Sequence, residues 1–273
     1  YTNLPVSVGL ASEFRYPNKP LTPKVLLIAI SQSGETADTV ACARAAQAAG
    51  CQVVALCNRP HSEISRFAAK TIPLDCGPEV SVASTKSFLA TLLCLYLFAL
   101  SCGRNRGLLK QHQLMRKFES LETLGAEIES VLANEAAMRP LGVVLSKSRQ
   151  VFFIGRGISY PVALEGALKL KEISYISAEG YAAGELRHGP LALIEKDTPV
   201  IAIAPEDEQL RQTASNASEA NARMAKTIYV TNSDEIRGHS RQDLTVGIPP
   251  IAEELSPFVT TPVVQILAYY AAK

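Results

Sequence analysis

Short runs of apolar, β-branched residues alternate along the chain with alanine-rich stretches. Residues 25–30 form one such run, an alanine-rich stretch covers residues 37–49, and a second run covers residues 52–56. Runs this short predict buried strands, whereas the longer alanine-rich stretch predicts a helix. Strands that alternate with helices are typical of parallel sheets whose faces are covered by helices.

The same order of elements occurs a second time. Ala11-Ser12-Glu13-Phe14 precedes the first run, and Ala183-Gly184-Glu185-Leu186 precedes a run over residues 200–204. A helical stretch over residues 210–225 and a run over residues 227–231 follow. We therefore interpret the chain as two copies of one α/β unit.

The second copy begins earlier than the first. It has an additional predicted strand over residues 151–154, and the first copy has no counterpart of this strand. The chain opens at Tyr1, within what should be the second strand of the first copy. For a complete first copy, we therefore expect a further strand, a glycine- and serine-containing turn and a helix upstream of Tyr1.

These patterns predict an α/β fold with two doubly wound parallel-sheet subdomains, each of three layers, related by the internal repeat. A chain of 273 residues, 47% of them hydrophobic, is long enough for two such cores. A charged helical stretch over residues 108–141, broken near Pro140, is interpreted as the connector. We assign residues 1–138, which include the connector helix, to subdomain 1 and residues 139–273 to subdomain 2.

Charge, hydropathy and cysteine usage narrow the range of partners. The formal net charge is +1, so no electrostatic attraction to nucleic acid or to an anionic membrane is predicted. The longest apolar stretch, residues 88–102, is short for a bilayer span, which favours a helix buried in the core. The six cysteines form no CxxC pair and no metal-ligand pattern. We expect a reduced, cytoplasmic protein without a metal site.

A loop rich in hydroxyl groups separates the first predicted strand from its helix. It contains Ser31, Ser33 and Thr36, together with Gln32 and Gly34, and it has no Lys or Arg. Backbone N–H groups at the start of a helix bind anions through hydrogen bonds and the helix dipole. One ordinary N-cap needs one hydroxyl, and here there are three. We therefore favour a site for a small phosphorylated metabolite over a simple N-cap.

The predicted helix that begins near Pro161 carries charged residues among apolar neighbours. Glu165, Lys169 and Glu172 are spaced by four and three residues, so they share one helix face. One interpretation is a solvated ion pair. The other is a largely buried helix with a carboxylate that faces a cleft and acts as a base. The residues by themselves leave both interpretations open.

Two glycines and a histidine flank this helix. Gly155 and Gly157 match the start of the dinucleotide-binding pattern GxGxxG, but Tyr160 occupies the place of the third glycine. We therefore reject a dinucleotide site. His188 lies between turn-forming residues, where a core histidine is not expected, and is a candidate functional residue.

Four segments of the chain resemble the signature segments of sugar isomerase (SIS) domains. They cover residues 31–39, 77–86, 164–175 and 181–193. In this order, they resemble the isomerase half of the glutamine:fructose-6-phosphate aminotransferase family. That family also has an N-terminal glutaminase domain and a C-terminal tail with a Schiff-base lysine, and neither lies within these 273 residues.

The resemblance implies a role for each candidate residue. The residues implied to hold the sugar phosphate are Ser31, Gln32, Ser33 and Thr36, and those implied to line the sugar site are Glu79, Val82 and Ser84. Glu172 would be the base that moves a proton between C1 and C2, with Lys169 as its charged neighbour. His188, supplied by a second subunit, would open the sugar ring. The implied substrate is fructose 6-phosphate or glucosamine 6-phosphate, the implied assembly is a homodimer or higher homo-oligomer, and no cofactor is implied.

Two other functions remain open at this point. A stand-alone glucosamine-6-phosphate deaminase of the same double-SIS design would run the reaction in the releasing direction. A non-catalytic sugar-phosphate sensor would keep the hydroxyl-rich loop but would not need Glu172 or His188, and both residues are present.

Overall fold

The computed structural model describes residues 1–14, 16, 21–238 and 244–273 of the chain. They form two compact units, unit 1 (Tyr1–Arg116) and unit 2 (Lys117–Lys273), and the boundary falls inside helix α5 (Gln111–Ala133). The division expected after residue 138 lies beyond the end of α5 and stays a prediction.

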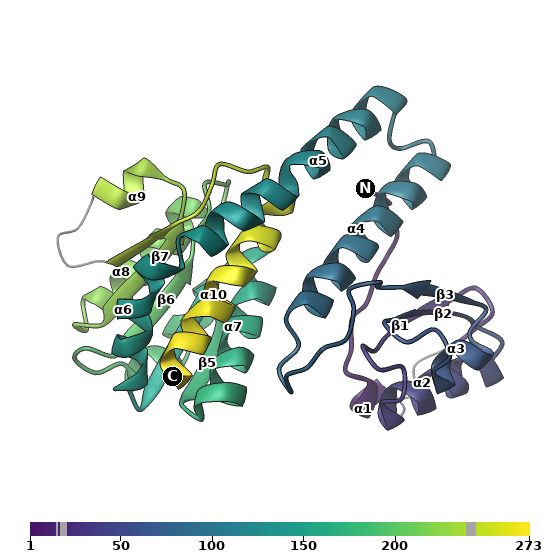
Figure 1. Cartoon of the computed structure of the whole chain (residues 1–273), viewed down its shortest axis with the longest axis horizontal. Helices are drawn as coiled ribbons and strands as arrows, with labels where there is room; N and C mark the ends of the chain where they lie inside the picture. The colour runs from purple at the N-terminus through teal and green to yellow at the C-terminus, as the bar shows by residue number, and fades with distance from the viewer. Residues whose placement is uncertain (15, 17–20, 239–243) are drawn as a thin grey trace. The chain divides into compact units, whose positions relative to one another are not determined.

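Unit 1 contains a parallel sheet with the strand order β1-β2-β3 (Figure 1). The strands are β1 (Leu26–Ile30), β2 (Gln52–Cys57) and β3 (Lys70–Pro73), and the helices are α1 (Ala11–Phe14), α2 (Ala37–Ala48), α3 (Glu63–Phe67) and α4 (Lys86–Asn105). Buried alanines of α2 and Ile64 of α3 form one apolar cluster with Val53 and Ala55 of β2. The two helices therefore cover the sheet through small and β-branched side chains, which allow close approach.

Unit 2 contains a larger parallel sheet with the strand order β5-β4-β6-β7-β8 (Figure 1). Its elements are α6 (Glu135–Ser146), β4 (Gln150–Gly155), α7 (Ser159–Ser174), β5 (Ser177–Ala182), η1 (Ala183–Arg187), η2 (Pro190–Leu193), β6 (Pro199–Ile203), α8 (Leu210–Asn221), β7 (Lys226–Thr231), α9 (Asp234–Gly238), β8 (Leu244–Gly247), η3 (Glu253–Leu255) and α10 (Ser256–Ala272). Here η marks a 3₁₀ helix.

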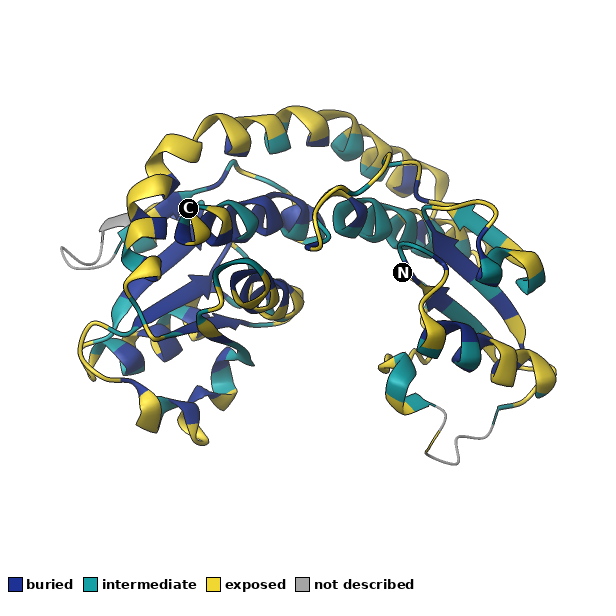
Figure 2. Cartoon of the chain, turned by 60° about the horizontal axis from the view of Figure 1, so that its bottom comes forward, coloured by how far each residue is buried: buried dark blue, intermediate teal, exposed yellow. Residues whose placement is uncertain are grey.

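Strands β4, β6 and β7 of unit 2 are buried on both faces (Figure 2). Successive side chains of a strand point to opposite faces of its sheet. Accordingly, Phe153 and Ile201 pack with α6, α7 and α10, whereas Phe152 and Val200 pack with η1 and α8. Unit 2 therefore has the expected three layers, with an apolar core on each side of its sheet.

The structure confirms the α/β class and the two parallel sheets. The order and direction of β1-β2-β3 repeat in β6-β7-β8, as the internal repeat predicts. The other predicted strands and helices of both copies agree with the structure to within a few residues, but the strand expected at the start of the chain is absent, because residues 1–10 form no regular element. β3, β5 and β8 were not predicted, because they are short and contain polar or small residues that give no clear alternation.

The expected break of the connector near Pro140 is wrong. Helix α5 ends at Ala133, α6 begins at Glu135, and Pro140 lies inside α6. The proline removes one backbone hydrogen bond, to the carbonyl of Ala136. Helix α6 continues because its buried residues, including Met138, join the apolar core that α7 and α10 share.

The expected core burial of residues 88–102 is also wrong. These residues form most of α4, in which the buried positions are Ser87, Leu100 and Gly103, and most others are only half-buried. Among the described residues, α4 is the helix whose length and composition would allow it to cross a membrane, a criterion that core helices also meet. All six cysteines are free in the structure.

Candidate functional site

The hydroxyl-rich loop lies between the end of β1 and the start of α2. Ser31 Oγ lies 3.0 Å from Thr36 Oγ1 and accepts a hydrogen bond from the Gly34 N–H at 3.0 Å. Ser33 Oγ accepts a hydrogen bond from the Glu35 N–H at 3.2 Å. The hydroxyls therefore hold the loop in a compact turn at the carboxyl end of the sheet, where open α/β sheets bind ligands.

Thr36 occupies the N-cap position of α2, but its side chain makes no capping hydrogen bond. Its hydroxyl lies beside Ser31 instead. The alternative of an ordinary N-cap is therefore wrong for Thr36. Because this hydroxyl leaves the first turn of α2 uncapped, the start of the helix keeps the polarity that attracts an anion.

Backbone hydrogen bonds to the end of β2 and to the residue that follows it fix the loop. The Ser31 N–H donates to the Leu56 carbonyl at 3.1 Å, and the Asn58 N–H donates to the Gln32 carbonyl at 3.0 Å. Gly34 has a φ of 67°, and a Cβ atom there would lie 2.1 Å from Ser62 Oγ. Only glycine therefore suits this position, both in conformation and in space.

Glu79 anchors the start of α4. Its Oε1 accepts hydrogen bonds from the N–H groups of Thr85 (3.0 Å) and Ser87 (2.9 Å) and from Ser87 Oγ (2.8 Å). Burial raises the pKa of Glu79, but the hydrogen bonds from Ser87 and Thr85 and the charge of Lys86 outweigh it, so the pKa is lowered. Glu79 is therefore a stable carboxylate, with one oxygen already committed to α4.

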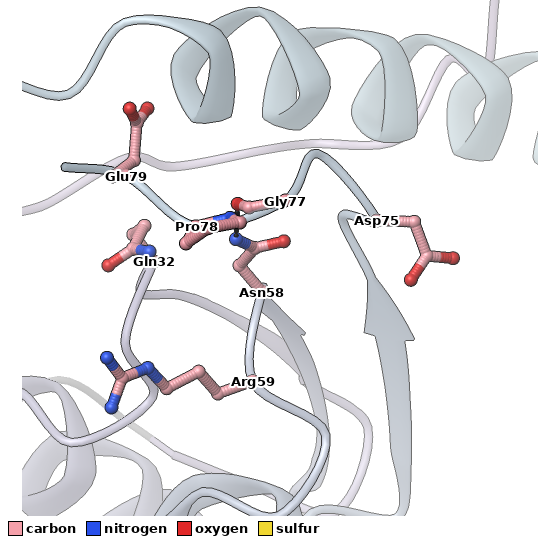
Figure 3. Close-up of a pocket in the computed structure, with 7 residues that line it drawn as sticks. All are labelled: Gln32, Asn58, Arg59, Asp75, Gly77, Pro78 and Glu79. Carbon is pink, nitrogen blue, oxygen red and sulfur yellow. Dashed lines mark hydrogen bonds between the residues drawn. The ribbon is translucent and has the colours of Figure 1, made fainter.

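A cavity of about 460 Å³ opens at the carboxyl ends of the three strands of unit 1 (Figure 3). It is lined by Gln32, Asn58, Arg59, Asp75, Gly77, Pro78 and Glu79. The side chain of Asn58 links two walls of the cavity, the segment after β2 and the segment after β3. Asn58 Nδ2 donates a hydrogen bond to the Gly77 carbonyl at 2.6 Å, and Asn58 Oδ1 accepts one from the Cys76 N–H at 3.3 Å.

Two of the predicted substrate-binding residues, Gln32 and Glu79, therefore lie at one cavity. The other predicted residues of the sugar site, Val82 and Ser84, lie between Glu79 and the start of α4 and do not line the cavity. Val82 is 97% exposed. Ser84 Oγ lies 2.6 Å from Ser87 Oγ. The roles of all these residues stay predictions.

The sequence did not identify Asn58, Arg59 or Asp75 as site residues. Each follows the carboxyl end of a strand, Asn58 and Arg59 after β2 and Asp75 after β3. Their position after a strand end was a usable signal for Asn58 and Arg59. It was not usable for Asp75, because β3 itself was not predicted.

The charged cluster on α7 is the second candidate site. Lys169 Nζ lies 2.5 Å from Glu172 Oε2 and 3.8 Å from Glu165 Oε1. The Lys169 side chain is only 4% exposed, whereas that of Glu172 is 30% exposed. The interpretation as a solvated ion pair is therefore wrong for Lys169, and Glu172 is the carboxylate of the cluster that a ligand can reach.

Glu165 lies at the buried end of this cluster. Its side chain is 6% exposed, and its Oε1 has no hydrogen-bond partner among the described residues. Burial raises the pKa of Glu165, while the charge of Lys169 and the amide of Gln265 oppose the shift without cancelling it. One buried ammonium is thus shared by two carboxylates in different surroundings.

His188 follows η1 and is exposed. The backbone N–H of His188 donates a hydrogen bond to the Glu185 carbonyl at 3.0 Å. Within the described residues, its imidazole has no hydrogen bond or ion pair. The ring is therefore available to a ligand or to another chain.

Comparison with known proteins identifies the family. The model of the SIS domain matches residues 1–101 and 144–272, so the chain belongs to the SIS domain family. Among curated proteins, it is 45% identical over its whole length to a glutamine–fructose-6-phosphate aminotransferase (isomerizing) of Bradyrhizobium diazoefficiens. It is 43% identical over 98% of its length to the enzyme of that name from Gloeobacter violaceus.

The chain spans 45% and 44% of the lengths of these two relatives. Among solved structures, it resembles the C-terminal domain of the glucosamine-fructose-6-phosphate aminotransferase from Francisella tularensis. The TM-score is 0.96 at 36% identity, over 100% of this chain and 77% of that one. The structural resemblance is thus to the C-terminal domain of such an enzyme.

Proposed function

We propose that the chain is the sugar-phosphate isomerase domain of a glutamine:fructose-6-phosphate aminotransferase. It binds fructose 6-phosphate and glucosamine 6-phosphate and interconverts the ketose and aldose forms in amino-sugar biosynthesis. The Lys169–Glu172 pair carries this proposal, because a buried ammonium contacts a carboxylate that a ligand can reach. A sensor that only binds sugar phosphates has no need of such a pair.

The chemistry requires one base and one group that opens the sugar ring. In our proposal, Glu172 removes a proton from one of the carbons C1 and C2 and returns it to the other, through a cis-enediol. The Lys169 ammonium, 2.5 Å away, fixes the orientation of the carboxylate. His188 donates a proton to the ring oxygen as the bond between this oxygen and the anomeric carbon breaks, and the anomeric hydroxyl loses its proton to solvent and becomes the carbonyl.

The phosphate group is bound far from the reacting carbons. In our proposal, the hydroxyls of Ser31, Ser33 and Thr36, the amide of Gln32 and the start of α2 hold it. Binding energy from a remote group of this kind fixes the geometry of the reacting atoms. The uncapped state of Thr36 supports this assignment.

We also propose that the protein is cytoplasmic and at least dimeric, with the exposed His188 serving the site of a second subunit. Light scattering of the protein that carries this chain measures its mass in solution. A strictly monomeric, active protein would contradict the proposed assembly.

The test of the proposed reaction is Glu172→Gln in the protein that carries this chain. The amide keeps the shape of the side chain and an oxygen for Lys169, so affinity for fructose 6-phosphate should stay within about twofold. Turnover should fall by at least about 10², the lower end of the effect of a general base. Exchange of the C1 or C2 proton with deuterated solvent, followed by NMR, measures the step directly.

Glu129→Gln, on an exposed position of α5, is the matched control and should leave exchange unchanged. An unchanged exchange rate in Glu172→Gln would remove Glu172 from the mechanism. Wild-type protein that binds fructose 6-phosphate but shows no exchange would favour the sensor.

A further inference from the structure

One residue that lines the cavity of unit 1, Arg59, has a positively charged side chain, whereas the hydroxyl-rich loop contains no Lys or Arg. Arg59 follows β2 by two residues, and its side chain extends to the side of the cavity where Gln32 lies (Figure 3). Gln32 belongs both to this cavity and to the loop over residues 31–36. The guanidinium and the candidate phosphate site are therefore neighbours, although 27 positions separate Gln32 from Arg59 in the sequence.

The backbone around Arg59 is held firmly. Its carbonyl accepts hydrogen bonds from Cys57 Sγ at 3.1 Å and from the Ser62 N–H at 3.3 Å. The preceding residue, Asn58, is bonded to both Gln32 and Gly77. The base of the side chain is thus fixed on the wall of the cavity.

The charge of Arg59, by contrast, has no partner. Within the described part of the chain, its guanidinium makes no hydrogen bond and no ion pair. The two carboxylates of the cavity do not neutralise it, because Asp75 lies at the opposite end and Glu79 directs Oε1 to the start of α4 (Figure 3). Arg44 of the same unit shows the alternative, since it pairs with Glu63 at 3.0 Å.

We propose that Arg59 binds the phosphate group of the sugar phosphate held at residues 31–36. A guanidinium presents parallel N–H donors that match phosphate oxygens, and charge-assisted hydrogen bonds of this kind are about twice as strong as neutral ones. The inference rests on the proposed function, because it assumes a sugar phosphate at this loop. It makes the affinity of this chain for its substrate depend in part on ionic strength.

The experiment compares Arg59→Gln and Arg59→Lys with wild type in the protein that carries this chain. Fructose 6-phosphate is titrated by calorimetry at about 20 mM and about 500 mM salt, where screening lengths differ severalfold. At low salt, Arg59→Gln should weaken binding about tenfold, the scale of one charge-assisted hydrogen bond. The loss should shrink at high salt, and Arg59→Lys should retain part of the affinity.

Arg66→Gln is the matched control, because Arg66 is an exposed arginine of the nearby helix α3 that does not line the cavity. It should leave affinity within about twofold of wild type. Thermal unfolding of each variant separates loss of binding from loss of fold.

The outcomes distinguish the inference from the proposed function. Wild-type protein that does not bind fructose 6-phosphate would contradict the proposed function itself. If the Arg59→Gln variant bound fructose 6-phosphate with the affinity and salt dependence of wild type, the role of Arg59 would be overturned and the proposed function would stand. An equal loss for fructose and for fructose 6-phosphate would also overturn this role, because Arg59 would then contact the sugar.

Discussion

Strands β1 and β6 occupy equivalent places in the two copies of the repeat, yet their surroundings differ. Their sequences, Leu26–Ile30 and Pro199–Ile203, are alike, and Ile-Ala-Ile ends both. All five residues of β6 are buried between β4 and β7. In β1, which pairs only with β2 among the described residues, Leu26 and Ile30 are 46% and 47% exposed.

Neighbouring strands and covering helices, rather than composition, therefore determine how far a strand is buried. A strand paired on both sides and covered on both faces loses contact with water at every position. The similar sequence of β1, which has a neighbouring strand on one side only among the described residues, keeps part of its apolar surface exposed. Equivalent substitutions in the two strands should therefore have unequal effects on stability.

The largest of the remaining expected effects is that of Ile201→Ala in β6. Ile201 is fully buried in the core of unit 2, so the variant should lose about 2 to 5 kcal/mol of unfolding free energy. The equivalent Ile28→Ala in β1 should lose less, about 1 to 2 kcal/mol, because Ile28 is only half-buried. Urea denaturation measures both losses. Equal losses would show that β1 is as well covered in solution as β6.

The two copies also differ in chemistry. The loop after β1 contains hydroxyls and glycine, whereas the loop after β6, residues 204–208, is acidic. The cluster of Glu165, Lys169 and Glu172 lies on α7 of unit 2. We propose on this basis that unit 1 binds the phosphate and that unit 2 moves the proton.

Thr36→Val tests this division of roles with a smaller expected effect. The substitution removes the hydroxyl but preserves the shape of the side chain. Affinity for fructose 6-phosphate should weaken about tenfold, or about 1.4 kcal/mol, while turnover at saturation should stay within about twofold. Steady-state kinetics separate the two effects.

Thr71→Val on β3 is the matched control, since it lies outside the loop, and it should change neither parameter. A fall in saturated turnover with unchanged affinity would assign Thr36 to the chemical step and contradict the division.

The smallest expected effects are opposite pH dependences of stability in the two units. The pKa of Glu79 is lowered by its hydrogen bonds, so wild type loses this contribution as pH falls below the ordinary glutamate value of 4.5. The pKa of Glu165 is raised by burial. The contribution of Glu165 to stability is therefore fully present below pH 4.5 and is lost as the pH rises above that value.

The variants Glu79→Gln and Glu165→Gln remove these two titrations. Relative to wild type, Glu79→Gln should become more stable as pH falls below 4.5, and Glu165→Gln should become more stable as pH rises above it. Denaturation curves measured from pH 3 to pH 8, with Glu129→Gln as the control, provide the comparison. Slopes of the same sign in both variants would contradict the two assigned environments.

The local elements of this protein follow from its sequence by itself. The apolar runs and alanine-rich stretches predict β1, α2, β2, β6 and their repeat, because period and propensity are properties of neighbouring residues. The spacing of Glu165, Lys169 and Glu172 predicts one helix face for the same reason.

The tertiary structure alone decided which side chains meet and how deeply each lies. It placed Arg59 beside Gln32, turned the Thr36 hydroxyl to Ser31 instead of the helix, and committed Glu79 to the start of α4. It also buried Lys169 while leaving Glu172 accessible. These outcomes depend on packing between segments that are distant in sequence. Parallel pairing brings the carboxyl ends of separate strands to one edge, and although the sequence indicates which residues follow a strand, it does not indicate which of these side chains come into contact.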